Sequence, residues 1–152
     1  MDDFSTKAGS PNSYGLIGAK ANSIAPSKRM LSSMTPTIVE KNGKLLMVLG
    51  TPGGSTIITS VLQTFLNVSE FGMTMQQAVD APRFHHQWLP DLVMFEPNQF
   101  EPATLDSLST KGYNINQKNN PVIGKVDAIL VLPNKKLQAG ADKRGDDASD
   151  EF

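Results

Sequence analysis

The chain has 152 residues, of which 39% are hydrophobic and 19% are charged, and this predicts one domain, or a large piece of one, with a buried core rather than a disordered tail. The formal net charge of −1 gives no electrostatic reason to expect nucleic acid as a partner. The absence of cysteine excludes disulfides and thiolate metal sites.

The first 35 residues are rich in Gly, Pro, Ser and Asn and show no periodicity, which predicts ordered loop with at most short strands. Two β-prone runs, residues 37–39 and 45–49, then flank Asn42-Gly43. Asn-Gly favours a two-residue hairpin turn, because both residues tolerate positive φ. The run 45–49 is apolar without alternation, so we expect its strand to be covered on both faces.

A helix should follow this strand. Six apolar residues recur there at helical spacing and predict one broad buried stripe: Ile57, Ile58, Val61, Leu62, Phe65 and Leu66. Ser55 is the expected N-cap, and Gly72 is the expected stop.

Two shorter helices are predicted further along the chain. The first begins at a Thr74 N-cap and ends at Pro82. The second covers residues 102–111, with Leu105 and Leu108 facing inward and Gly112 as C-cap. Strands are expected at residues 92–95, 113–116, 128–132 and 137–139, and residues 142–152 form a polar tail. This uneven order of strands and helices favours an α+β fold.

Gly53-Gly54, between the buried strand and the first helix, is the most informative local feature. Two adjacent glycines let successive N–H groups point at one spot, and a helix N-terminus behind them adds partial positive charge. That arrangement suits an oxyanion or a carboxylate. From spacing alone, a plain strand-to-helix turn is the favoured interpretation.

Three further groups carry possible chemistry, each with a simpler alternative. Ser32-Ser33 offers two hydroxyls to a carboxylate, or is an ordinary polar turn. Asp2-Asp3 offers a counter-charge to an ammonium group, or is a solvated terminus. His85-His86 suggests a metal, but adjacent histidines rarely point the same way and no third ligand follows at a regular spacing. We expect a packed loop there instead, with a satisfied Arg83.

Four segments together extend the interpretation. Asp2-Asp3-Phe4 opens the chain, Ser32-Ser33 lies within residues 28–37, Gly53-Gly54 lies within residues 50–55, and residues 81–90 contain Arg83 and the two histidines. In this order and spacing they resemble the γ-glutamyltransferase (γ-glutamyltranspeptidase) family of bacterial type. The resemblance covers nearly the whole chain, is weakest over residues 91–136, and returns at residues 140–147. It identifies residues 1–152 as the C-terminal portion of the small, catalytic subunit.

The resemblance implies an N-terminal-nucleophile hydrolase fold, an αββα sandwich of which this chain is an incomplete part. Family members are precursors that cut themselves, and the new N-terminal Thr attacks the γ-glutamyl amide of glutathione and related compounds. An amino acid, a peptide or water then accepts the glutamyl group, and no metal or cofactor takes part. In the family, Asp3 would hold the substrate α-amino group, Ser32 and Ser33 the α-carboxylate, and Gly53 and Gly54 the oxyanion.

The family's Thr nucleophile lies upstream of the Asp-Asp-Phe motif, where this chain begins. We therefore expect the 152 residues alone to be inactive, to expose apolar surface and to self-associate. The large subunit and the N-terminal part of the small subunit are the implied partners, and the implied compartment is periplasmic or extracellular. Two alternatives stay open: a related acylase or polyglutamate-processing enzyme, and a non-catalytic γ-glutamate-binding module. Asp3 with Ser32 and Ser33 favours a free γ-glutamyl head group over a bulky acyl chain.

Overall fold

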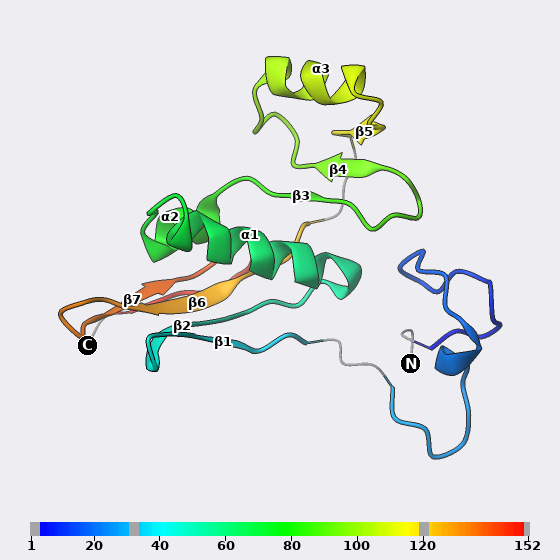
Figure 1. The fold of residues 1–152 in the computed structure, drawn as a ribbon, viewed down its shortest axis with the longest axis horizontal. Coiled ribbons are helices and arrows are strands. Elements are labelled where there is room, and N and C mark those ends of the chain that lie inside the picture. Colours follow the sequence, from blue (N-terminus) through cyan, green and yellow to red (C-terminus); the bar gives the residue numbers. More distant parts are fainter. Residues whose placement is uncertain (1–3, 31–33, 119–121, 151–152) are drawn as a thin grey trace.

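A computed structural model describes residues 4–30, 34–118 and 122–150. These residues form a four-stranded sheet in the order β1-β2-β6-β7 and a three-stranded sheet in the order β3-β4-β5. Figure 1 shows α1 and α2 lying over one face of the larger sheet, with the smaller sheet and α3 beyond this helical layer. The α+β class predicted from the sequence is confirmed.

The element bounds are close to those expected from the sequence. The larger sheet contains β1 (Thr37–Lys41), β2 (Lys44–Gly50), β6 (Asp127–Val131) and β7 (Leu137–Gly140), and the smaller contains β3 (Phe84–His85), β4 (Val93–Phe95) and β5 (Ile115–Asn116). The helices are α1 (Ile57–Ser69), α2 (Met75–Asp80) and α3 (Pro102–Thr110), with short 3₁₀ turns η1 (Lys20–Asn22) and η2 (Gly54–Thr56). The two-residue strand β3 was not predicted, since it is too short to show a period.

The hairpin between β1 and β2 turns at Asn42-Gly43, as predicted. Both residues have positive φ, 54° and 70°, and Lys41 pairs with Lys44 across the turn. This is the combination that lets a two-residue turn follow the twist of its strands. The first described residues, 4–30, are loop apart from η1 and two isolated β-bridges, Ser5 with Ser23 and Pro11 with Ile17, which also agrees with the sequence.

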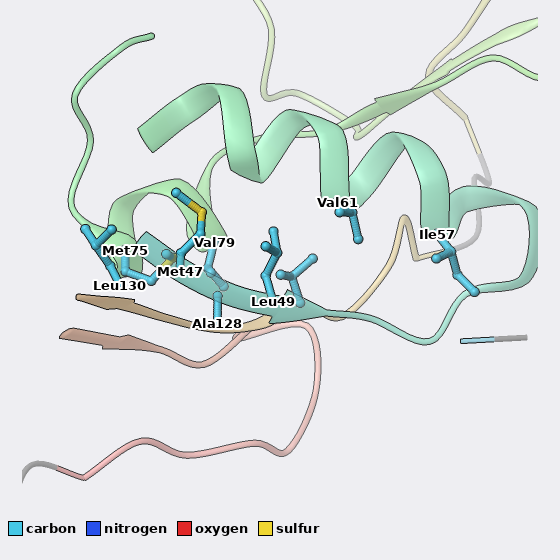
Figure 2. Packing of buried hydrophobic residues seen from close by; sticks show 9 residues of the cluster. Met47, Leu49, Ile57, Val61, Met75, Val79, Ala128 and Leu130 are labelled. Carbon is cyan, nitrogen blue, oxygen red and sulfur yellow. The ribbon is translucent and has the colours of Figure 1, made fainter. Parts of the chain in front are cut away.

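The main core lies between the larger sheet and the helices. Figure 2 shows its apolar side chains meeting across this interface: Met47 and Leu49 from β2, Ala128 and Leu130 from β6, Ile57 and Val61 from α1, and Met75 and Val79 from α2. Successive strand residues point to opposite faces, so Val48, which lies between Met47 and Leu49 in β2, points to the outer face of the sheet.

The prediction that the strand 45–49 is covered on both faces is wrong for the described chain. Ile38 and Ile129, which pair with Val48 from the two neighbouring strands, are 71% and 38% exposed. Leu137 of β7 is exposed as well. The apolar run therefore reflects an outer face that no described segment covers.

Helix α1 buries a narrower stripe than expected. Its buried residues, Ile57, Ser60, Val61 and Thr64, have the i, i+3, i+4, i+7 spacing of one helix face. Ile58 and Leu62 were expected in the stripe, but they are 73% and 51% exposed, because they lie about one helical step around the axis from it.

The predicted helix ends were confirmed in part. Ser55 is not the N-cap of α1: the N-cap is the next residue, Thr56, whose hydroxyl donates to the Gly53 carbonyl at 2.9 Å, and the helix begins at Ile57. Thr74 does cap α2, in a capping box with Gln77. Lys111 is the C-cap of α3, and Gly112 follows it with φ 94°. None of the helices in the described part of the chain has the length and apolar character that a bilayer crossing requires.

Candidate functional site

Gly53 and Gly54 form the turn between β2 and α1. Their φ angles are 142° and 58°, values that side-chain-bearing residues rarely adopt. Within the described residues neither of their N–H groups donates a hydrogen bond, whereas the Thr56 N–H is occupied by the Gly53 carbonyl at 3.1 Å. The turn therefore presents two free backbone donors just ahead of a helix N-terminus, the arrangement an anionic oxygen requires.

A second backbone segment, around Gly124, packs against this turn. The Gly53 Cα faces Gly124 so closely that a Cβ on Gly53 would lie 3.4 Å from the Gly124 Cα, and one on Gly124 would lie 2.8 Å from the Ser60 Cβ. The Lys125 N–H donates to the Thr51 hydroxyl at 2.7 Å. The turn thus lies between α1 and residues 123–126, the segment that leads into β6.

A buried ion pair in turn holds residues 123–126 in place. Arg83 and Asp142 are 1% and 0% exposed, and the Arg83 Nη1 lies 2.7 Å from the Asp142 Oδ2. The same Nη1 donates to the Ile123 carbonyl at 3.0 Å, and Nη2 donates to the Val79 carbonyl at 2.6 Å. Burial lowers the pKa of the Arg83 guanidinium, although its hydrogen bond to Asp142 acts in the opposite direction.

The Asp142 carboxylate is fully engaged. Beyond Arg83, it accepts from the Val126 N–H at 2.8 Å and from the Arg144 N–H and Nη1, each at 3.0 Å. Burial alone would raise the pKa of Asp142, but these hydrogen bonds and the Arg83 charge outweigh it and hold the pKa below its usual range.

Arg144 extends the network to a second carboxylate. Its Nη2 lies 2.7 Å from the Glu96 Oε2 and its Nε 2.5 Å from the Glu96 Oε1, a bidentate pair. Burial would lower the pKa of Arg144, but Glu96 and Asp142 raise it above its ordinary value. The expected polar tail, residues 142–152, therefore begins inside the fold and not in solvent. The expectation of a satisfied Arg83 is confirmed for its two terminal nitrogens, whereas its Nε has no partner among the described residues. The partner Asp142 was not predicted.

A loop from the beginning of the chain lies over the glycine turn. The Tyr14 ring packs against Gly54, so a Cβ there would overlap the ring. Beneath the loop is a cavity of ≈ 470 Å³ whose lining includes Tyr14, Gly53, Thr56, Gln87 and Met94. Of the two glycines, Gly53 therefore lines a cavity.

A second cavity, of ≈ 580 Å³, lies along the outer face of the larger sheet. Its lining includes Met34, Thr35 and Pro36 as well as Thr51 and Pro52. The segment that directly follows Ser33 therefore runs beside the strand end that leads into the glycine turn.

Three of the predicted site residues, Asp3, Ser32 and Ser33, lie outside the described residues. The segment that follows Asp3 is anchored: Phe4 and Ser5 are buried, and the Ser5 N–H donates to the Asn22 carbonyl at 3.0 Å.

The two histidines diverge, as the sequence suggested. His85 is buried, with Nδ1 2.8 Å from the Thr59 hydroxyl and Nε2 3.0 Å from the Gln87 Oε1, whereas the His86 Nε2 lies 3.0 Å from Asp91. Among the described residues there is no group of three side chains placed to hold a metal ion. The expected packed loop is wrong beyond Arg83 and His85, because Trp88 is 76% exposed.

The whole chain, residues 1–152, matches the sequence profile of the family described as Gamma-glutamyltranspeptidase. It is 49% identical over 147 residues to a glutathione hydrolase proenzyme of Escherichia coli K12, covering 97% of this chain and 25% of that protein. A second glutathione hydrolase proenzyme, from Pseudomonas aeruginosa, is 42% identical over 149 residues and is covered to 26%. The chain thus spans about a quarter of the length of these curated relatives.

Solved structures of γ-glutamyltranspeptidases are also similar to this chain. A mutant of the Helicobacter pylori γ-glutamyltranspeptidase superposes with a TM-score of 0.89 at 50% identity, over 95% of this chain and 78% of that one. The Pseudomonas nitroreducens γ-glutamyltranspeptidase complexed with L-DON superposes with the same TM-score at 41% identity, over 99% and 78% of the two chains.

Proposed function

Because the chain belongs to the γ-glutamyltranspeptidase family, we propose that it is the C-terminal portion of the small subunit of a γ-glutamyl hydrolase or transferase. Its substrates are glutathione and related γ-glutamyl compounds, and the acceptor is water, an amino acid or a peptide. In the complete protein the rest of the small subunit and the large subunit complete an αββα sandwich. The uncovered apolar face around Ile38 and Ile129 supports this, since a second layer would bury it.

In this proposal, residues 1–152 supply electrostatic stabilisation and substrate binding, and an upstream Thr supplies the nucleophile. The Thr oxygen bonds to the γ-carbonyl carbon, and the carbonyl oxygen becomes negative. The Thr α-amino group takes up the hydroxyl proton and passes it to the leaving amine as the C–N bond breaks, and a γ-glutamyl-enzyme forms. Water or the acceptor amine releases the glutamyl group by the reverse sequence of steps. No cofactor is needed.

The observation that carries the proposal is the conformation of Gly53 and Gly54. Both have positive φ, and neither amide has an acceptor within the described residues. Such donors are fixed before the reaction begins, so they stabilise a developing oxyanion without reorganising. We assign them as the oxyanion hole.

The proposed clamp for the glutamyl head group consists of Asp3 for the α-amino group and Ser32 and Ser33 for the α-carboxylate. Support comes from their described neighbours: Phe4 and Ser5 are buried, and Thr35 lines the cavity that reaches Thr51. A compartment outside the cytoplasm, periplasmic or extracellular, is part of the same proposal and rests on the family alone.

The experiment is the variant Gly54→Ala in the full-length, processed enzyme, assayed by chromophore release from a γ-glutamyl anilide. An alanine at φ 58° is strained, and relieving the strain would rotate the peptide planes that orient the two donors. We expect kcat to fall about 10²-fold or more, the usual effect of losing one oxyanion donor.

Two further variants isolate the cause. Gly43→Ala is the matched control, because Gly43 has φ 70° in the β1–β2 turn but no atom within 4 Å of an added Cβ. The double variant Tyr14→Ala/Gly54→Ala removes the ring that the new methyl would meet. Wild-type kcat in Gly54→Ala would reduce the two glycines to a turn, and an equal loss in Gly43→Ala would trace the effect to backbone strain in general.

A further inference from the structure

The loop that carries Tyr14 onto Gly54 is closed by its own hydrogen bonds. The Asn12 side-chain oxygen accepts from the Tyr14 and Leu16 N–H groups, each at 3.0 Å, and the Gly15 N–H donates to the Asn12 carbonyl at 3.0 Å. These bonds fix the shape of the loop, but not its place over the glycine turn.

One side chain from outside the loop fixes its place. The Gln87 Nε2 donates to the Tyr14 carbonyl at 3.0 Å and to the Leu89 carbonyl at 3.1 Å. Both amide hydrogens are therefore used. The reversed amide orientation would set its oxygen against two carbonyl oxygens, so the bonds themselves determine which atom is nitrogen.

This orientation determines the proton on His85. The Gln87 Oε1 can only accept, so the His85 Nε2, 3.0 Å away, carries a hydrogen. In the neutral ring, Nδ1 is then an acceptor. The Thr59 hydroxyl lies 2.8 Å from Nδ1 and 3.1 Å from the Thr56 carbonyl, and its single hydrogen serves one of these two acceptors at a time. Thr59 belongs to α1, the helix that the glycine turn precedes.

A chain of hydrogen-bonded groups thus runs from Thr59 through His85 and Gln87 to the Tyr14 carbonyl. It joins the first turns of α1 to the loop that lies on Gly54. We propose that Gln87 is a positioning residue: it tethers the loop at residues 12–16 over Gly53 and Gly54 and thereby holds the two backbone donors in their geometry. The catalytic part of this proposal rests on the proposed function.

The test uses Gln87→Ala and Gln87→Glu in the full-length, processed enzyme. The Ala variant removes the tether. The Glu variant keeps the size and the acceptor for His85, but it places oxygen where two hydrogens met carbonyl oxygens. Gln99→Glu is the control, because Gln99 is an exposed glutamine on a different loop.

Two readouts are needed. Hydrogen exchange of peptides covering residues 12–18 should be about tenfold faster or more in both Gln87 variants, as expected for the loss of hydrogen bonds that hold a local structure in place. The kcat for a γ-glutamyl anilide should fall by at least as large a factor as kcat/KM, since a displaced oxyanion hole acts on the transition state. Gln99→Glu should change neither.

Unchanged exchange in both Gln87 variants would overturn the tether. Faster exchange with wild-type kcat would overturn the positioning role. Failure of the proposed function has a different signature, wild-type kcat in Gly54→Ala, and in that case the exchange rates still decide whether Gln87 holds the loop. Thermal melting of each variant confirms that it is folded.

Discussion

The buried pair of Arg83 and Asp142 gives the sharpest prediction of stability. In Asp142→Ala, the guanidinium loses a carboxylate at 2.7 Å while remaining out of contact with water, and the Val126 and Arg144 N–H groups lose their acceptors. Breaking a buried ion pair by removing one partner typically costs about 3–5 kcal/mol. The loss should exceed that of any single apolar contact in this region.

The assay is thermal unfolding of the full-length enzyme and its variants. The entropy of unfolding is about 2.1 cal/mol/K per residue, so in an enzyme about four times the length of this chain a loss of about 4 kcal/mol predicts a fall in Tm of roughly 3 °C. Asp146→Ala is the control, since Asp146 lies four residues further along and is exposed. Asp142→Asn should also be strongly destabilised, because an NH₂ group must then face at least one of the donors that the carboxylate accepts from.

The reasoning would be refuted by a Tm for Asp142→Ala within about 0.5 °C of the wild type, because a change that small corresponds to less than about 1 kcal/mol in an enzyme of that length. A second consequence can be checked with the same protein. Arg83 holds Ile123, and the next residue, Gly124, supports Gly53, so any Asp142→Ala enzyme that folds should also show a reduced kcat.

Three further predictions concern the titration of Asp142, the role of Asp3 and the activity of the 152 residues alone. The pKa of Asp142 is lower in the folded protein than the value of about 3.9 in the unfolded chain, so its carboxylate adds stability above about pH 3.9, and that stability is lost as pH falls through the folded pKa. The Tm difference between wild type and Asp142→Asn should therefore be constant above about pH 5 and shrink below about pH 4. A constant difference down to about pH 2 would contradict this. Asp3→Ala in the complete enzyme should raise KM for a γ-glutamyl anilide by a factor equivalent to a few kcal/mol, because the substrate ammonium loses its counter-charge, and an unchanged KM would remove Asp3 from the site. A fragment made of these 152 residues alone should release no chromophore from that substrate, because the proposed Thr nucleophile belongs to another segment of the complete protein. The fragment should also sediment as oligomers through its exposed apolar sheet face. Turnover by the purified fragment, free of host enzyme, would refute the nucleophile argument.

Local chemistry explains which parts of the fold were predictable. The Asn42-Gly43 turn and the Thr74 capping box each depend on residues within a few positions, so the sequence shows them directly. The glycine turn was located for the same reason, but spacing alone could not separate an anion site from a turn.

Long-range partners were not predictable. Arg83 meets Asp142 across 59 positions, and Gln87 meets Tyr14 across 73, and nothing in either local pattern points to the other. The exposure of Ile58 and Leu62 was missed for a related reason. An apolar stripe shows that a face avoids water in the complete protein, but it does not say which other segment covers it.

Arg83 also closes a loop in the chain. Its backbone exchanges hydrogen bonds with Glu96, with the Arg83 N–H donating to the Glu96 Oε2 at 3.0 Å and the Glu96 N–H donating to the Arg83 carbonyl at 3.1 Å, and its side chain binds the Ile123 carbonyl. Residues 97–122, which include α3 and β5, therefore leave and return at one fixed point. Doubling the length of a loop closed in this way costs only about 0.6 kcal/mol of closure entropy. The connecting parts of this segment should accept insertions or a grafted peptide, because the two ends that reach the glycine turn would stay in place. α3 and β5 themselves should not be removed, since Leu105 and Ile115 pack with β4.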